Sequence, residues 1–137
     1  MRRDSASAAT TAATDGARLV YLPWYTRDFM SATRGWSLTA KGLYRELLDA
    51  QWDMGSLPSD PHDLQQLAGA TAAEWRTWDQ FVATKFPLCA DGRRRNSRLE
   101  QHRQKALHVS AVRSEIGRRG GLANGLRSNG AASGKPQ

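Results

Sequence analysis

Arginine is the residue type with the clearest chemical potential in this sequence, and the arginines crowd into its last third. Residues 93–137 hold eleven Lys/Arg and two Asp/Glu, a net charge of +9, whereas residues 1–92 have a net charge of −2. Guanidinium groups bind phosphate oxygens, and each contact releases counterions condensed on a nucleic acid. The segregated charge predicts a polyanion partner, a nucleic acid first and an anionic membrane second, with a solubilising basic tail as the alternative. The candidate backbone-binding residues are Arg93, Arg94, Arg95, Arg98, Arg103, Arg118 and Arg119.

A second candidate group, Arg76 and Gln80, belongs to the second helix of a predicted helix-turn-helix. In such motifs this helix presents side chains to base edges in the major groove, where Arg binds guanine and Gln binds adenine. The alternative is a purely structural helix, because Glu74 and Asp79 would repel phosphate and its two tryptophans must pack.

Patterns typical of enzymes and metal sites do not occur in the sequence. The three histidines are scattered, and there is no phosphate-binding loop, zinc-protease motif or nucleophile elbow. The single cysteine, Cys89, excludes an internal disulfide and a multi-cysteine metal site, and it fits a reducing cytoplasm. We therefore expect a cytoplasmic protein that is not an enzyme and has no catalytic residue, metal or cofactor.

The elements that position these groups are predicted to be mainly helical. After a short helix near residues 28–30, apolar spacings of three and four predict a helix from Ser37 to Gly55. Gly42 inside it predicts close packing against a neighbour, since glycine costs about 1 kcal/mol relative to alanine there. Two further helices follow the N-caps Asp60 and Thr71, the second with a capping box, and their spacing predicts the helix-turn-helix.

The remaining elements are a predicted hairpin and a long helix. Asp91-Gly92 is a typical two-residue hairpin turn between short strands at 86–89 and 93–95, with Pro87 at an edge. From Ser97 a last helix is predicted to run to about Ile116. A helix-turn-helix plus a short β-hairpin and a long C-terminal helix predicts a mainly α, winged-helix-like fold.

Composition divides the 137 residues into three parts, with room for one domain. Residues 1–18 are rich in Ala, Ser and Thr and predict a disordered leader. Residues 19–116 are predicted to form the winged-helix-like domain. Residues 117–137 contain six glycines, too many for a stable helix, so they predict a basic flexible tail. No apolar run is long enough to span a membrane, so no transmembrane helix is expected. Between the two polyanions we predict DNA and no membrane as the partner.

Short motifs follow one another in a distinctive order along this chain. They are Tyr21-Leu22-Pro23-Trp24-Tyr25, Asp28-Phe29, Leu38-x-x-x-Gly42-x-Tyr44-Arg45-x-Leu47-Leu48-Asp49, Trp52, Leu57-Pro58-x-Asp60, Asn96, Arg98-Leu99-Glu100 and Arg113-Ser114-Glu115-x-Gly117-Arg118-Arg119-Gly120-Gly121. Together they resemble the YdaU-like family, a phage and prophage family of unknown function whose members occur near replication genes. The resemblance implies a winged-helix-like DNA-binding or primosome-associated role. Arg94, where the family more often has an apolar residue, and the long leader depart from the pattern.

Two functions stay open at this point. The first is a phage-type DNA-binding protein that acts in replication initiation or its control. The alternative is a protein-interaction adaptor, a helicase-loader or primosome partner, that does not bind DNA directly. In it, Trp24 and Tyr25, the pair expected to be exposed, or the last helix would dock a replication protein, and the last helix could also pair with a second copy.

Overall fold

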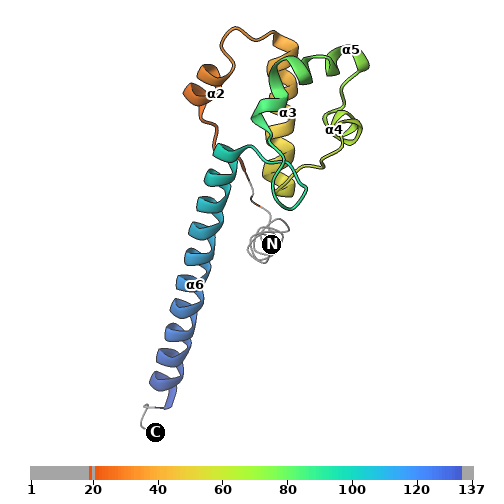
Figure 1. Ribbon diagram of the computed structural model, residues 1–137. Helices are drawn as coiled ribbons and strands as arrows, with labels where there is room; N and C mark the ends of the chain where they lie inside the picture. Colours follow the sequence, from red (N-terminus) through yellow and green to blue (C-terminus); the bar gives the residue numbers. More distant parts are fainter. Residues whose placement is uncertain (1–18, 20, 134–137) are drawn as a thin grey trace. The chain divides into compact units, whose positions relative to one another are not determined.

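The computed structural model of the protein describes residue 19 and residues 21–133, and its fold is mainly helical (Figure 1). The chain divides between Arg103 and Gln104 into two compact units. Its helical elements are α2 (Thr26–Ala32), α3 (Leu38–Met54), α4 (Pro61–Ala68), α5 (Ala72–Trp75), the π-helical turn η1 (Trp78–Val82), the 3-10 turn η2 (Ala83–Lys85) and α6 (Ser97–Ser133). No helix among these residues combines the length and apolar character needed to cross a bilayer.

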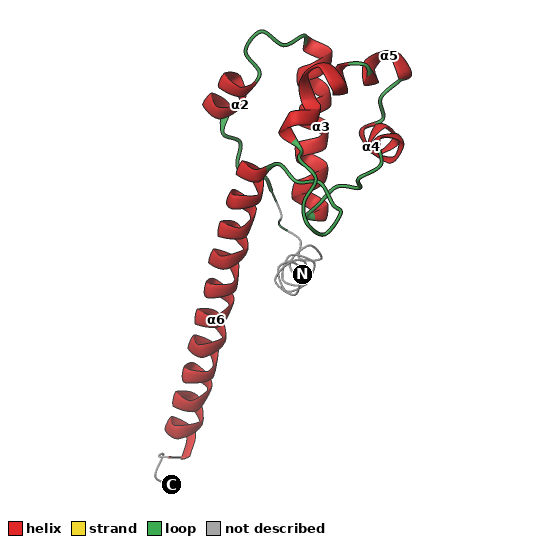
Figure 2. Ribbon diagram, viewed as in Figure 1, coloured by secondary structure: helices red, strands yellow, loops and turns green. Residues whose placement is uncertain are grey.

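Helix α3 is the centre of the first unit, and α4, α5 and η1 pack against it (Figure 2). Its ends were predicted correctly. The Ser37 hydroxyl accepts a hydrogen bond from the Ala40 N–H, and Gly55 adopts φ +91°, a left-handed conformation that ends the helix. Its inner face is buried along its length and comprises Ala40, Leu43, Tyr44, Leu47, Leu48, Gln51 and Trp52.

Gly42 corrects one expectation about α3. A Cβ atom built at this position would meet no atom within 4 Å, and the residue is exposed. Gly42 therefore lies on the solvent face of α3, and the predicted close packing is wrong.

The second predicted pair of helices begins as expected and then changes form. Asp60 caps α4 through the His62 N–H, and Thr71 and Glu74 form the predicted capping box of α5. The predicted single helix beyond Thr71 is wrong, because α5 ends after four residues and the chain continues as η1 and η2. At this point the Thr77 hydroxyl donates to the Glu74 carbonyl, and a side chain that bonds to a local carbonyl competes with the regular helix.

The predicted two-stranded hairpin is not formed by the described residues. The turn exists, since Gly92 has φ +79° and donates its N–H to the Cys89 carbonyl at 3.0 Å. However, the returning segment makes only isolated β-bridges, of Arg94 with Leu88 and with Leu57. The N–H and carbonyl of Arg94 both bond to Leu57, in the loop after α3, at 2.9 Å. Pairing to that loop, and the missing N–H of Pro87, explain why no pair of strands develops.

Helix α6 starts as predicted but is longer than predicted. Asn96 precedes it and accepts the Leu99 N–H on its side-chain oxygen at 2.9 Å. The predicted end near Ile116 is wrong, because the helix continues to Ser133. The glycines at 117, 120, 121 and 125 all keep a negative φ, since glycine can adopt helical angles at a cost of about 1 kcal/mol each. Flexibility of this segment stays a prediction, and the leader 1–18 and residues 134–137 lie outside the described residues.

Candidate functional site

Arg95, predicted to bind phosphate, belongs instead to the structure of the turn. Its Nη1 and Nη2 donate to Asp91 Oδ1 and Oδ2 at 3.0 and 2.7 Å. The two side chains are only 6% and 13% exposed. The hydrogen bond from Arg95 is the main reason that the pKa of Asp91 lies below its usual value. Because this guanidinium is buried and paired in two places, we correct its assignment as a backbone-binding residue.

Arg93 and Arg94 also direct their side chains at the protein. The Nε of Arg93 donates to the Ser56 hydroxyl at 2.9 Å. Arg94 donates from Nε to the Ser59 carbonyl and from Nη1 to the Phe86 carbonyl, both at 3.1 Å. These half-buried guanidiniums connect the turn to the loops after α3 and η2. The sequence predicted that they bind the phosphate backbone and did not predict these contacts within the protein.

Arg103 and Arg98 lie near the start of α6 and differ in exposure. Arg103 is completely buried, and its Nε donates to the Trp52 carbonyl in the last turn of α3 at 3.1 Å. The helix end is stabilised by a donor to its otherwise unpaired carbonyl, so Arg103 is corrected to a structural residue. Arg98 is 67% exposed and forms an ion pair with Asp28 at 2.9 Å. Arg98 therefore remains accessible to a ligand.

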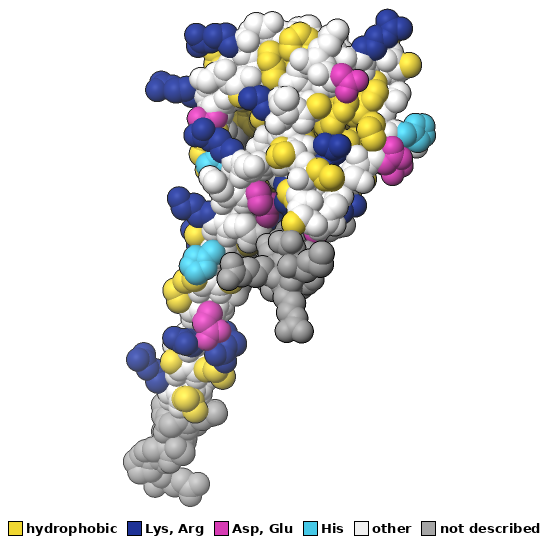
Figure 3. Space-filling model, viewed as in Figure 1, with side chains coloured by type: hydrophobic (Ala, Val, Ile, Leu, Met, Phe, Trp, Pro, Cys, Tyr) yellow, Lys and Arg dark blue, Asp and Glu magenta, His cyan; other side chains and the backbone are white. Residues whose placement is uncertain are grey.

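The second unit presents exposed positive charge with few carboxylates near it in the sequence. Residues 104–133 contain five cations and one carboxylate, and basic side chains lie at several heights along this helix (Figure 3). Arg118 and Arg119 are exposed and share Glu115, at 2.8 and 2.9 Å. These pairs lower the pKa of Glu115, the bond from Arg118 most of all. The other three, Lys105, Arg113 and Arg127, are exposed and form no ion pair with the described residues.

Arg76 and Gln80, the predicted base-reading pair, are both exposed. Arg76 follows α5, and Gln80 lies within η1. The change from α to π geometry between them means that they do not share one regular helix face. Their accessibility agrees with a contact role, and base recognition stays a prediction.

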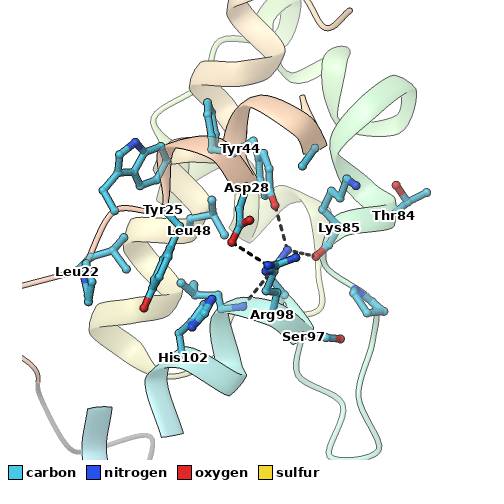
Figure 4. A pocket seen from close by; sticks show the side chains of 17 residues that line it. Leu22, Tyr25, Asp28, Tyr44, Leu48, Thr84, Lys85, Ser97, Arg98 and His102 are labelled. Carbon is cyan, nitrogen blue, oxygen red and sulfur yellow. Dashed lines mark hydrogen bonds and ion pairs between the residues drawn. The ribbon is translucent and has the colours of Figure 1, made fainter. Parts of the chain in front are cut away.

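A pocket of about 350 Å³ lies in the first unit, and the sequence analysis did not predict it (Figure 4). The residues before α2 meet α2, α3, η2 and the start of α6 around it. Its apolar lining includes Leu22, Pro23, Trp24, Tyr25, Phe29, Leu48 and Leu99, and its polar lining includes Asp28, Tyr44, Lys85, Asn96, Arg98 and His102. Most of these residues belong to the short motifs named in the sequence analysis. Polar residues among those aromatic motifs were therefore the one feature of the sequence that could have indicated a pocket.

Asn96 organises the polar side of the pocket. Its Nδ2 donates to the Tyr44 hydroxyl at 3.2 Å and to the Lys85 carbonyl at 2.9 Å, while its Oδ1 caps α6 through Leu99. Its backbone N–H and carbonyl bond to the side-chain amide of Gln51 at 2.6 and 3.2 Å. This buried network fixes the start of α6 against α3 and η2.

Two polar atoms at the pocket could each form a further hydrogen bond. Burial raises the pKa of Tyr44, so its hydroxyl keeps its proton at neutral pH. That hydroxyl accepts from Asn96, and no acceptor for its own proton lies among the described residues. The Nε2 atom of His102 is buried and has no hydrogen-bond partner in the described part of the chain.

Aromatic rings form the outer part of the pocket. Trp24 and Tyr25 are 39% and 45% exposed, which confirms the expectation that this pair lies at the surface. Tyr25 stacks on His102 with ring centroids 4.1 Å apart, and Figure 4 shows the two side chains next to each other. The Arg45 guanidinium covers a face of Trp24 at 3.6 Å. Tyr25 is therefore the more accessible ring for a stacking ligand.

Metal binding has no candidate in the part of the chain that the structure describes. Within those residues, no group of three His, Cys, Asp or Glu side chains lies close enough together to hold an ion. The pocket and the exposed cations offer ring faces, hydrogen-bonding groups and positive charges. These groups can bind a ligand by stacking, by hydrogen bonds and by charge.

Comparison with known proteins gives one match, to a family model. It covers residues 20–102, which include every residue lining the pocket. Neither the curated proteins nor the solved structures give a match. The link to phage replication is not part of this finding. The chain belongs to the family described as "Protein of unknown function (DUF1376)".

Proposed function

We propose that this protein binds DNA through the phosphate backbone, chiefly with the exposed cations of residues 104–133. The observation that supports it is the contrast between the two groups of arginines. Arg93, Arg94, Arg95 and Arg103 bond to protein groups of the first unit. The five cations of the second unit are exposed, with a single carboxylate among them.

The exposed ion pairs of Arg118 and Arg119 do not prevent phosphate binding. Surface pairs of this kind contribute about 0–1 kcal/mol, so a phosphate can replace Glu115 at little cost. A helix of 30 residues is about 45 Å long, which is enough for contacts with several phosphates. The basic helix thus takes the role that the sequence first suggested for the turn.

Base recognition by the segment from the end of α5 to η1 is a further part of this proposal. The exposed Arg76 and Gln80 remain the candidates for contacts with base edges. A winged-helix form of the first unit would place the turn at Asp91-Gly92 as the wing, and its arginines would then support the wing rather than bind DNA. A cytoplasmic role in phage replication is proposed from the resemblance of the motifs alone.

The test compares two triple variants of equal charge. One changes Arg113, Arg119 and Arg127 to Ala, and the other changes Arg27, Arg34 and Lys41 to Ala. Five of the six side chains are exposed and Lys41 is half-buried, so both variants are expected to fold, and each removes three positive charges.

In a mobility-shift assay on duplex DNA, the first variant should lose at least tenfold in affinity and the second much less. Equal losses would mean that only the net charge matters. A larger loss for the second variant would place the contacts on the first unit.

The second candidate function is a protein-interaction adaptor, favoured by the exposed Trp24 and Tyr25 beside a pocket. A replication protein from the host is the partner that the resemblance suggests.

The exposed Val109, Val112 and Ile116 on α6 also offer a face for pairing with a second copy. Light scattering during size-exclusion chromatography tests self-pairing. A pull-down with and without nuclease separates a protein partner from a nucleic acid one.

A further inference from the structure

We infer that the pocket of the first unit binds an unpaired base of a single-stranded nucleic acid, with the adjoining phosphate on Arg98 and Lys85. This inference rests on the proposed nucleic-acid binding and extends it by naming a base site and a preference for single strands. The site is distinct from the basic helix of residues 104–133, so each can be tested separately.

The aromatic rings give the pocket a stacking surface. Tyr25 is held by its stack on His102, at 4.1 Å and an interplanar angle of 13°, yet nearly half of its surface remains accessible. Trp24 lies next to it and is also exposed. Proteins that bind single strands use such rings because every base has a face that stacks, whatever the sequence.

The polar interior favours a base over the apolar side chain of a protein partner. Tyr44 as a whole residue is 6% exposed, and its hydroxyl has a proton without an acceptor in the described residues. The His102 Nε2 atom is buried and lacks a partner there as well. A base edge offers acceptors and donors to both groups, whereas a hydrocarbon side chain would leave them unpaired at a cost in free energy.

Charge and size agree with a nucleotide unit. Arg98 and Lys85 line the pocket, and Arg98 is mostly exposed although it pairs with Asp28 (Figure 4). An exposed pair of this kind can share its guanidinium with a phosphate. The volume of about 350 Å³ lies at the lower end of the range for small-ligand sites. A base within a duplex has both faces covered by its neighbours, so only an unpaired or flipped base can enter.

The experiment uses the full chain and two fluorescein-labelled probes, an oligothymidylate and a duplex of the same length. Tyr25→Ala removes the accessible ring. Tyr25→Phe keeps the ring and removes only its hydroxyl. Tyr21→Ala is the matched control, since Tyr21 is exposed and does not line the pocket. By fluorescence anisotropy, Tyr25→Ala should weaken oligothymidylate binding about tenfold. The duplex affinity of Tyr25→Ala should stay within about twofold of the wild type, because a duplex offers no unpaired base to stack on the ring. The oligothymidylate affinities of Tyr25→Phe and Tyr21→Ala should also stay within about twofold, because the first keeps the pocket ring and the second changes a ring outside the pocket.

Three results would overturn the inference. Equal effects of Tyr25→Ala and Tyr21→Ala on the single strand would show that the pocket ring makes no contact. Equal loss on the duplex would show that the pocket does not select unpaired bases. Competition by thymidine monophosphate at the same concentration as the oligonucleotide would identify a free nucleotide as the ligand.

The proposed function has a separate outcome in the same assay. If the Tyr25 variants behave like the wild type while the change of Arg113, Arg119 and Arg127 weakens both probes, the base site fails and backbone binding stands. If the wild type binds neither probe, both proposals fail.

Discussion

Replacing Arg95 by Ala tests whether the arginines of the turn stabilise the fold. In the folded protein its guanidinium makes two hydrogen bonds to the Asp91 carboxylate, at 3.0 and 2.7 Å, and both side chains are largely buried. After the substitution, the carboxylate still accepts a hydrogen bond from the Arg93 N–H at 3.0 Å. Arg95→Ala is therefore expected to strand a negative charge in a poorly hydrated place.

The size of the effect follows from the burial of the pair. Removal of one partner from a buried ion pair costs roughly 3–5 kcal/mol, because the other charge loses both water and its counterion. Asp91 keeps some exposure and one backbone bond, which places the expected loss near the lower end, at about 3 kcal/mol. A domain with a total stability of about 5–15 kcal/mol would lose a large fraction of it.

Urea unfolding of the full chain, followed by tryptophan fluorescence, measures this difference. Arg113→Ala is the control, because Arg113 is exposed and a surface substitution of this kind changes the free energy of unfolding by about 0.5 kcal/mol or less. If Arg95→Ala is no more destabilising than Arg113→Ala, the structural role is wrong. The turn would then return as a candidate site for phosphate.

Three further predictions concern stability, and urea unfolding measures each. Gly42→Ala should raise the free energy of unfolding by up to about 1 kcal/mol, because the added methyl meets nothing within 4 Å and reduces the entropy of the unfolded chain; a loss would contradict the open surroundings. Asn96→Ala should lower it by about 3 kcal/mol, since three side-chain hydrogen bonds of about 1 kcal/mol each disappear; a loss below 1 kcal/mol would refute the network. The lowered pKa of Asp91 means that its pairing stabilises the fold fully above the ordinary aspartate pKa of about 3.9 and is lost as the pH falls from there through the folded value. Asp91→Asn should therefore reduce the fall in the free energy of unfolding at acid pH. If that fall is the same in the variant, this carboxylate does not contribute to it.

Short-range signals in the sequence were sufficient to predict where α3, α4 and α5 begin. Ser37, Asp60 and Thr71 cap α3, α4 and α5, and the positive φ of Gly55 and Gly69 ends two of these helices. Each of these features involves residues within a few positions of one another, so the pattern of residue types contains the necessary information.

The partners of the arginines could not be read in the same way. Arg93 bonds to Ser56, 37 residues earlier, and Arg103 bonds to Trp52, 51 residues earlier. A cluster of arginines has the same composition whether it faces solvent or connects loops, and only the tertiary contacts decide. The pocket was missed for the same reason, because residues near Trp24 and near Arg98 meet only in the folded chain.

The salt dependence of duplex binding tests the central claim most directly, because its slope counts the phosphate contacts. If all five cations of residues 104–133 bind phosphates, the logarithm of the affinity should fall with the logarithm of the salt concentration with a slope of about −4.5. Changing Arg113, Arg119 and Arg127 to Ala should make the slope shallower by about 2.7, and changing Arg27, Arg34 and Lys41 to Ala should leave it unchanged. A slope that responds to the second variant and not to the first would contradict the assignment of backbone binding to the basic helix.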